Sequence, residues 1–256
     1  MSNDNNYEAI ITLFKSDEEV NHELGFQLLE SIGPCSNLTL ALLLSKRPTY
    51  LWRCLDNNWQ ELTKLITKLE YHYEYLPQLP DNFYQLSQLE VCSLSHCYLT
   101  RIPDKIHVLK KLRRLILNYN PIEEIPETIG QLQHLEELSL VGNNLKVFPP
   151  CILELSNLEI LSLIDNDITA FPRGVLRLRK LKKLILRNNQ LTEIPIELCW
   201  LEDLEILDLS ENQLTRLPNN LTALRQLKIL YLSHNPLKKS EQEKIRNILP
   251  NTVVYI

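Results

Sequence analysis

Leucine and isoleucine recur at a fixed spacing over most of the chain. When the sequence is written in rows of 23 residues from Ile66, apolar residues fall at positions 1, 4, 6 and 11 of nearly every row. Seven full rows end at Gln226, and a partial eighth row begins at Leu227. Positions 4 and 6 alternate with outward positions 3, 5 and 7, as in a short strand. A period of about 20 to 50 residues predicts a solenoid, because a single coil cannot bury its own apolar face.

Two polar or turn-forming columns accompany this apolar pattern. Position 9 is asparagine in six rows: Asn120, Asn143, Asn166, Asn189, Asn212 and Asn235. An asparagine both donates and accepts hydrogen bonds, so a stack of them is expected to satisfy backbone groups of the next coil. Position 15 is proline in seven rows, from Pro80 to Pro218. Proline has no N–H and a fixed φ, which turns the chain away from the sheet.

The rows resemble the leucine-rich repeat, with the pattern L-x-x-L-x-L-x-x-N-x-L-x-x-L-P-x-x-I-x-x-L-x-x. Their second half resembles the LPxxIxxL subclass of intracellular and bacterial proteins. The resemblance implies an α/β fold: a curved, horseshoe-shaped leucine-rich-repeat solenoid with a parallel concave β-sheet and an N-terminal α-helical cap. It also implies a function in protein binding.

The period divides the chain into three expected regions. Residues 1–65 do not fit the repeat and are expected to form a helical N-terminal cap, residues 66–237 the repeats, and residues 238–256 a C-terminal cap helix and edge strand. Both ends of a solenoid need such caps to hide the terminal core. With these caps the chain is expected to be complete. An independent docking domain at residues 1–65 remains the alternative.

Helical spacing predicts the elements of the two caps. Val20, Leu24, Leu28 and Ile32 line one face of a helix that Ser16 and Glu19 begin as a capping box and Gly33-Pro34 ends. Further helices are expected near residues 7–14, 38–47 and 52–65. After the repeats, Ser240 and Glu243 predict another capping box, and residues 252–256 read as a last edge strand.

Composition and charge favour a cytoplasmic protein. The net charge is −5, with 27 basic and 32 acidic residues, which gives no reason to expect nucleic-acid binding. The polar N-terminus lacks the features of a secretory signal, and no apolar run is long enough to span a membrane. The six scattered cysteines, with no terminal cluster, are expected to be free thiols.

No motif in the chain predicts catalysis. The sequence has five glycines and lacks a phosphate-binding glycine loop, a nucleophile elbow and a zinc-protease motif. His72 and His96 fall in adjacent rows, where neighbouring surface histidines are a better interpretation than a metal pair. Cys92, at position 4, reads as a small core residue. We therefore expect no enzyme activity, no cofactor and no metal.

Outward positions of the sheet carry an apolar band that predicts an interface with a protein partner. The expected partner-binding residues are Ile116, Tyr119, Val141, Ile160, Ile164, Ile185, Arg187, Ile206, Asp208 and Tyr231. Ile229 belongs to the same band, and Arg114 and Glu211 complete its polar rim. Strand propensity alone is one alternative explanation for the isoleucines. A self-associating structural protein, with the band buried in a homodimer, is the alternative function.

Overall fold

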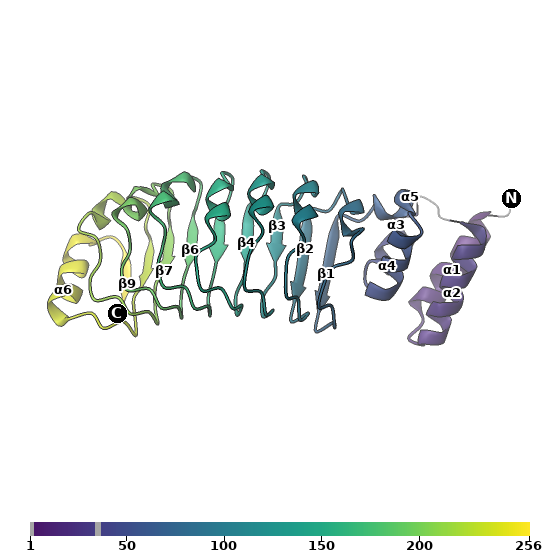
Figure 1. Cartoon of the computed structure of the whole chain (residues 1–256), viewed down its shortest axis with the longest axis horizontal. Coiled ribbons are helices and arrows are strands. Elements are labelled where there is room, and N and C mark those ends of the chain that lie inside the picture. The colour runs from purple at the N-terminus through teal and green to yellow at the C-terminus, as the bar shows by residue number, and fades with distance from the viewer. Residues whose placement is uncertain (1–2, 34–36) are drawn as a thin grey trace.

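The computed structural model describes residues 3–33 and 37–256, and these fold as an elongated α/β solenoid (Figure 1). Within this part of the chain, nine parallel strands form one sheet in chain order. The strands are β1 (Lys68–His72), β2 (Val91–Ser95), β3 (Arg114–Ile116), β4 (Glu137–Ser139), β5 (Ile160–Ser162), β6 (Lys183–Ile185), β7 (Ile206–Asp208), β8 (Ile229–Tyr231) and β9 (Val253–Tyr255). The predicted fold class is confirmed.

The strand register reproduces the 23-residue rows. Leu138 pairs with Leu161, and Leu161 pairs with Leu184, so position 4 of each coil stacks on position 4 of the next. These three leucines are fully buried. Opposite the sheet, short 3₁₀ helices return the chain, and most of them begin directly after the proline at position 15. They are Phe83–Gln85, Asp104–Val108, Glu127–Gln131, Pro150–Glu154, Arg173–Arg177, Ile196–Trp200 and Leu221–Ala223.

The asparagines of position 9 form a ladder through the core, but they contact the preceding coil. In Asn166, Nδ2 donates to the carbonyl oxygen of Leu140 at 2.9 Å, and Oδ1 accepts from the N–H of Leu145 at 3.1 Å. Both partners lie one coil nearer the N-terminus. Each asparagine follows the strand of its own coil, and its side-chain amide hydrogen-bonds to backbone groups on both sides of the turn in the preceding coil.

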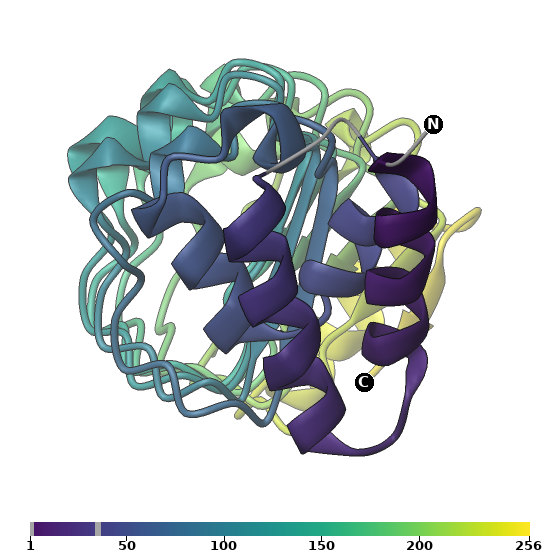
Figure 2. The same cartoon turned by 90° about the vertical axis from the view of Figure 1, so that its right-hand side faces the viewer.

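Five helices lie at the N-terminal end: α1 (Asn3–Lys15), α2 (Glu19–Ile32), α3 (Leu38–Leu44), α4 (Pro48–Asp56) and α5 (Gln60–Thr63). Figure 2 shows α1 and α2 in front of the solenoid at this end. The single helix predicted over residues 52–65 is wrong. Two helices, α4 and α5, cover this region, and they are separated at Asn58, whose φ is +53°. Gly33 ends α2 with φ +86°, whereas Pro34 lies outside the described residues.

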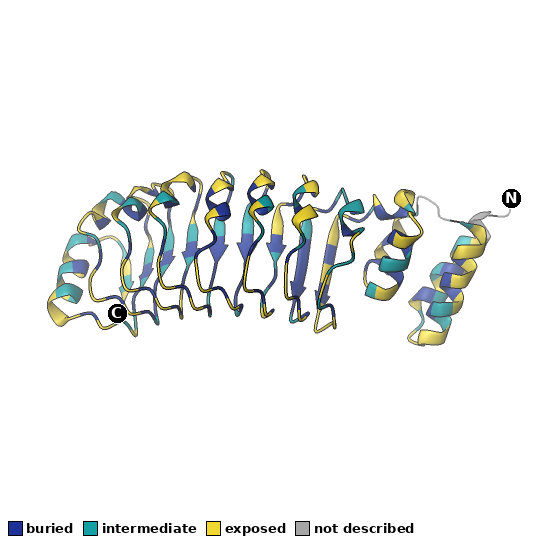
Figure 3. Cartoon of the chain, viewed as in Figure 1, coloured by how far each residue is buried: buried dark blue, intermediate teal, exposed yellow. Residues whose placement is uncertain are grey.

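The predicted apolar face of α2 is present, but it faces outward. Val20, Leu24, Leu28 and Ile32 are exposed, whereas Phe26 on the other side of the helix is fully buried. Figure 3 shows that the N-terminal helices carry both exposed and buried residues. The Phe26 ring stacks on Tyr50 and Trp59 with centroid distances of 5.4 Å. Packing of the Phe26 ring in this aromatic cluster accounts for the orientation of α2, because aromatic side chains bury large apolar areas.

Both predicted capping boxes are wrong. Helix α2 begins after Glu18, and Ser16 Oγ instead accepts from the Glu18 N–H at 3.2 Å. In the C-terminal region, α6 (Lys239–Ile248) begins after Lys238, two residues before the predicted N-cap Ser240. The predicted edge strand is confirmed, since β9 pairs in parallel with β8.

Candidate functional site

The outward positions of the sheet place the predicted apolar residues in two rows. Position 3 runs through Ile160, Lys183, Ile206 and Ile229 in successive strands. Position 5 runs through Ile116, Ser139, Ser162, Ile185, Asp208 and Tyr231. The predicted band is therefore interrupted, since two buried serines separate Ile116 from Ile185.

An aliphatic cluster occupies the C-terminal half of this face. We define the aliphatic cluster as five isoleucines together with one aromatic residue at its end, all of them half-buried: Ile160, Ile164, Ile185, Ile206, Ile229 and Tyr231. Strand β9 extends it with Val253 and Tyr255, which are 53% and 49% exposed. Tyr255 stacks on Tyr231 with ring centroids 4.9 Å apart. Sequence reasoning missed these two residues because it did not align the tail strand with the repeat columns.

Val141 does not belong to the exposed surface, which corrects the sequence-based assignment. It is 9% exposed and lies two residues after the end of β4. Its N–H donates to Asn118 Oδ1 at 3.0 Å, and its carbonyl oxygen accepts from the Tyr119 N–H at 2.6 Å. These two hydrogen bonds join the Val141 backbone to the preceding coil, and the chain turns directly after it at Gly142, where φ is +63°.

A stack of aromatic rings occupies the N-terminal half of the same face. His96 lies between Tyr73 and Tyr119, with centroid distances of 4.6 and 4.5 Å. All three residues have positive φ, and Gly142 occupies the same position in the next coil. A Cβ atom at Gly142 would lie 2.4 Å from the Tyr119 ring, so only glycine leaves room for the ring to lie there. Tyr73 is 77% exposed and Tyr119 is 47% exposed.

The aromatic stack includes Tyr119 from the predicted site but was otherwise missed. The available signal was an aromatic or imidazole residue at position 8 in three successive rows. His96 therefore packs between tyrosines, and within residues 3–33 and 37–256 no group of three or more His, Cys, Asp or Glu side chains could hold a metal ion.

The predicted polar rim consists largely of exposed ion pairs. Arg187 Nη2 lies 2.7 Å from Glu211 Oε1, and Arg114 Nε lies 2.6 Å from Glu137 Oε2. Asp208 Oδ1 accepts from the Ser210 N–H at 2.9 Å. Exposed pairs of this kind each stabilise the fold by under about 1 kcal/mol. Breaking such a pair to contact a partner therefore costs little free energy.

The residues at position 2, which directly precede the strands, form a row of ion pairs between neighbouring coils. Its three cross-strand pairs have N–O distances of 2.6–2.8 Å: Arg113–Glu136, Lys182–Glu159 and Lys228–Glu205. The hydrogen bond from Lys228 lowers the pKa of the Glu205 carboxyl. A hollow of about 460 Å³ beside this row is lined by charged and polar side chains, unlike the mostly apolar sites that hold small molecules.

The cysteines of the described chain are buried free thiols: Cys54, Cys92, Cys97, Cys151 and Cys199. Cys35 lies outside the described residues. Burial raises the pKa of Cys54 and Cys92 to about 12 and that of Cys151 and Cys199 to about 11. Because the thiolate is the reactive form, these side chains are poor nucleophiles near neutral pH.

These pKa shifts predict a large difference in thiol reactivity between folded and unfolded protein. At pH 7.5 or so, the folded protein should react slowly with Ellman's reagent at these five cysteines, since raised pKa values leave little thiolate. The same protein in denaturant should release about six equivalents. Rapid reaction of two or more thiols in the folded state would contradict the packing described for them.

Comparisons with known proteins agree with this architecture. Family models described as leucine-rich repeat match residues 111–132, 133–191 and 179–237. No curated protein sequence matches the chain. One similar solved structure is a leucine-rich-repeat protein of Leptospira interrogans, with 28% identity, a TM-score of 0.48, and coverage of 77% of this chain and 68% of that one.

Plant receptor structures are also similar. The leucine-rich-repeat ectodomain of the Arabidopsis thaliana receptor kinase GASSHO1/SCHENGEN3, in complex with CASPARIAN STRIP INTEGRITY FACTOR 2, has 28% identity and a TM-score of 0.57; the match covers 69% of this chain and 25% of that one. A plant peptide hormone receptor in complex with RGF2 has 24% identity and a TM-score of 0.61; the match covers 73% of this chain and 32% of that one.

The repeat pattern, the stacked parallel strands and the family matches together define the class. The chain is a leucine-rich-repeat protein. It spans about a quarter to a third of the length of the plant receptor chains that it matches. Among the described residues, none of the helices is both long enough and apolar enough to cross a membrane.

Proposed function

We propose that this chain is a non-catalytic protein-interaction module, a scaffold or regulatory subunit, that binds one protein partner on the concave face of its sheet in the cytoplasm. The observation that carries the proposal is the aliphatic cluster, whose half-exposed side chains continue from coil to coil into the exposed Val253 and Tyr255. An apolar surface bordered by ion pairs is typical of a protein interface.

The family supports a binding role rather than a catalytic one. The plant ectodomain that resembles this chain was solved in complex with CASPARIAN STRIP INTEGRITY FACTOR 2. We propose a comparable use of the repeats here, with a different and unidentified partner. We also propose the division into a cap at residues 1–65, repeats at 66–237 and a C-terminal cap at 238–256, in which the repeats bind and the caps close the core.

Affinity capture from an extract of the source cells tests this proposal. The bait is the tagged full chain, and the variants are Ile164→Asp, Ile185→Asp and Arg177→Asp. The first two place a charge in the aliphatic cluster, whereas Arg177 lies on the 3₁₀ helix of the opposite side. We expect a partner, identified by mass spectrometry, to be captured by the natural chain and by Arg177→Asp and lost with both isoleucine variants.

Two other outcomes would favour the alternative functions. If the isoleucine variants capture the partner normally and a change within residues 1–65 abolishes capture, the helical region is the docking domain. If light scattering gives twice the 30.0 kDa chain mass and Ile164→Asp restores the monomer, the cluster is a homodimer interface.

A further inference from the structure

Helix α2 displays an apolar stripe on the outer side of the N-terminal end. Val20, Leu24, Leu28 and Ile32 follow one another at four-residue spacing and are 78%, 46%, 40% and 38% exposed. At about 1.5 Å per residue the stripe is about 18 Å long. Single exposed apolar residues are ordinary, but four in line on one helix form a continuous apolar surface.

This stripe is distinct from the buried face of α2. Gly25, Phe26 and Leu29 are buried on the side of the helix that packs on the rest of the cap. A Cβ atom at Gly25 would lie 3.2 Å from Leu13 Cβ, which shows how closely α1 and α2 approach. The outer face of a solenoid cap is normally polar, so an apolar outer face is unexpected in a cap that only closes the core.

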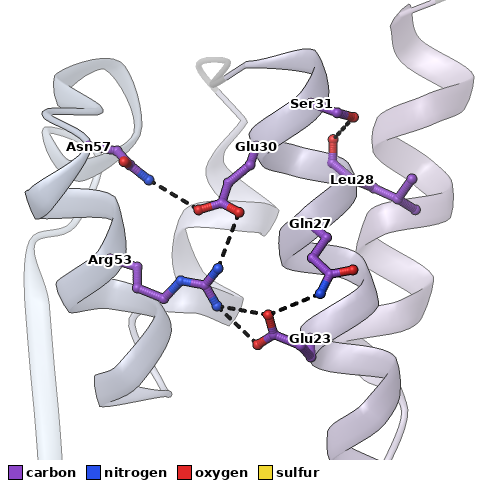
Figure 4. A network of polar contacts seen from close by, with 7 residues as sticks. All are labelled: Glu23, Gln27, Leu28, Glu30, Ser31, Arg53 and Asn57. Carbon is purple, nitrogen blue, oxygen red and sulfur yellow. Dashed lines mark hydrogen bonds and ion pairs between the residues drawn. The ribbon is translucent and has the colours of Figure 1, made fainter.

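The segment that carries the stripe is strongly acidic. Residues 3–32 include seven acidic residues and one lysine, which gives them a formal charge of −6, whereas the whole chain has −5. Arg53 from α4 binds Glu23 Oε2 at 3.0 Å and Glu30 Oε2 at 3.2 Å, and Leu28 points away from this network (Figure 4). Arg53 thus pairs with two carboxylates and neutralises only one of the two negative charges. Asp17 and Glu19 near the start of the helix are exposed.

We infer that α2 is a second docking surface, and that it accepts a basic amphipathic helix. Such a helix would place its apolar side on the stripe and its lysine or arginine side chains beside the acidic flanks, as in other helix-to-groove or helix-to-helix contacts. A second copy of this chain fits less well, because it would bring two segments of charge −6 together. An anionic membrane surface is disfavoured for the same reason.

A pair of synthetic peptides tests this surface directly. The first is a fluorescein-labelled peptide of about 18 leucine and lysine residues with leucines at helical spacing. The second has glutamate in place of every lysine. Fluorescence anisotropy with the full chain should show binding of the lysine peptide alone, and raising the salt concentration from about 0.05 to 0.5 M should weaken that binding at least about tenfold.

Variants of the chain separate the stripe from other surfaces. The double variant Leu24→Gln with Leu28→Gln removes apolar area without changing charge, and it should weaken peptide binding at least about tenfold. Val147→Gln is the matched control, because Val147 is 70% exposed in the repeats. Ile164→Asp should bind the peptide normally, so the peptide assay tests the surface of α2 independently of the proposed concave site.

Three results would overturn the inference. One is equal binding of the lysine peptide by the double variant and the natural chain, and another is equal binding of the glutamate peptide. The third is a dimer in light scattering that the double variant converts to monomer, since the stripe would then be covered by a second copy. Circular dichroism of the double variant checks that its helices are retained.

Discussion

Replacing Leu161 by alanine is expected to lower the free energy of unfolding by about 2–5 kcal/mol. The side chain is fully buried, and its strand partners Leu138 and Leu184 are buried on either side. Alanine would leave a cavity in the middle of a continuous core, where coils on both sides restrict relaxation. Leu207→Ala removes the equivalent side chain two coils further along and should cost a similar amount.

Urea denaturation followed by circular dichroism measures this loss. The control is Val147→Ala, because Val147 is 70% exposed and its truncation should change the stability by no more than about 0.5 kcal/mol. Losses below about 0.5 kcal/mol for both leucine variants would contradict the repeat register, since position 4 would then not face the core.

Asn166→Ala is expected to cost about 2–4 kcal/mol through lost hydrogen bonds. The side chain is 7% exposed, and its Nδ2 donates to the carbonyl oxygens of Leu140, Leu163 and Ile164 at 2.9–3.1 Å. Its Oδ1 accepts from the Leu145 N–H at 3.1 Å. The oxygens of Leu163 and Ile164 also accept from Asn189 Nδ2 and the Gly142 N–H, so alanine would leave the Leu140 carbonyl oxygen and the Leu145 N–H without a partner. Each unsatisfied buried group costs about 1–3 kcal/mol.

Gln190→Ala is the control for the asparagine variant. Gln190 is exposed and donates to Asp167 Oδ1 at 2.8 Å, so it also loses a cross-coil hydrogen bond, but water can replace that bond. Its expected cost is within about 0.5 kcal/mol. Equal losses for the two variants in the same urea titration would show that the asparagine ladder does not stabilise the coils.

The repeat fold could be predicted because each structural requirement recurs in many rows. A leucine such as Leu161 is uninformative alone, but a leucine or cysteine occurs at its position in eight successive rows. The same holds for Asn166, because asparagine recurs at position 9 in six rows and so predicts where each coil turns after its strand. Only the direction of the asparagine contacts was wrong, because spacing along the chain does not indicate whether a side chain reaches the previous coil or the next one.

The arrangement of the N-terminal helices and of the candidate site depends on side-chain packing, which the repeat pattern does not show. Helix α2 has two apolar faces, one with Leu24 and Leu28 and one with Phe26 and Leu29. Helical spacing identifies both faces but does not decide which of them is covered. On the sheet, the column position of Val141 predicts an outward side chain, whereas this residue is only 9% exposed beside the turn at Gly142. In each case, contacts between distant elements determine exposure.

The affinity of the purified partner for the natural chain and for Ile164→Asp tests the central claim most directly. Calorimetric titration should show a Kd at least about tenfold weaker for Ile164→Asp, because the charge must be desolvated in the complex. The melting temperature should fall by no more than about 2 °C, as for a change near the surface. An unchanged Kd for Ile164→Asp, with the partner still bound at one-to-one stoichiometry, would contradict binding on the concave face.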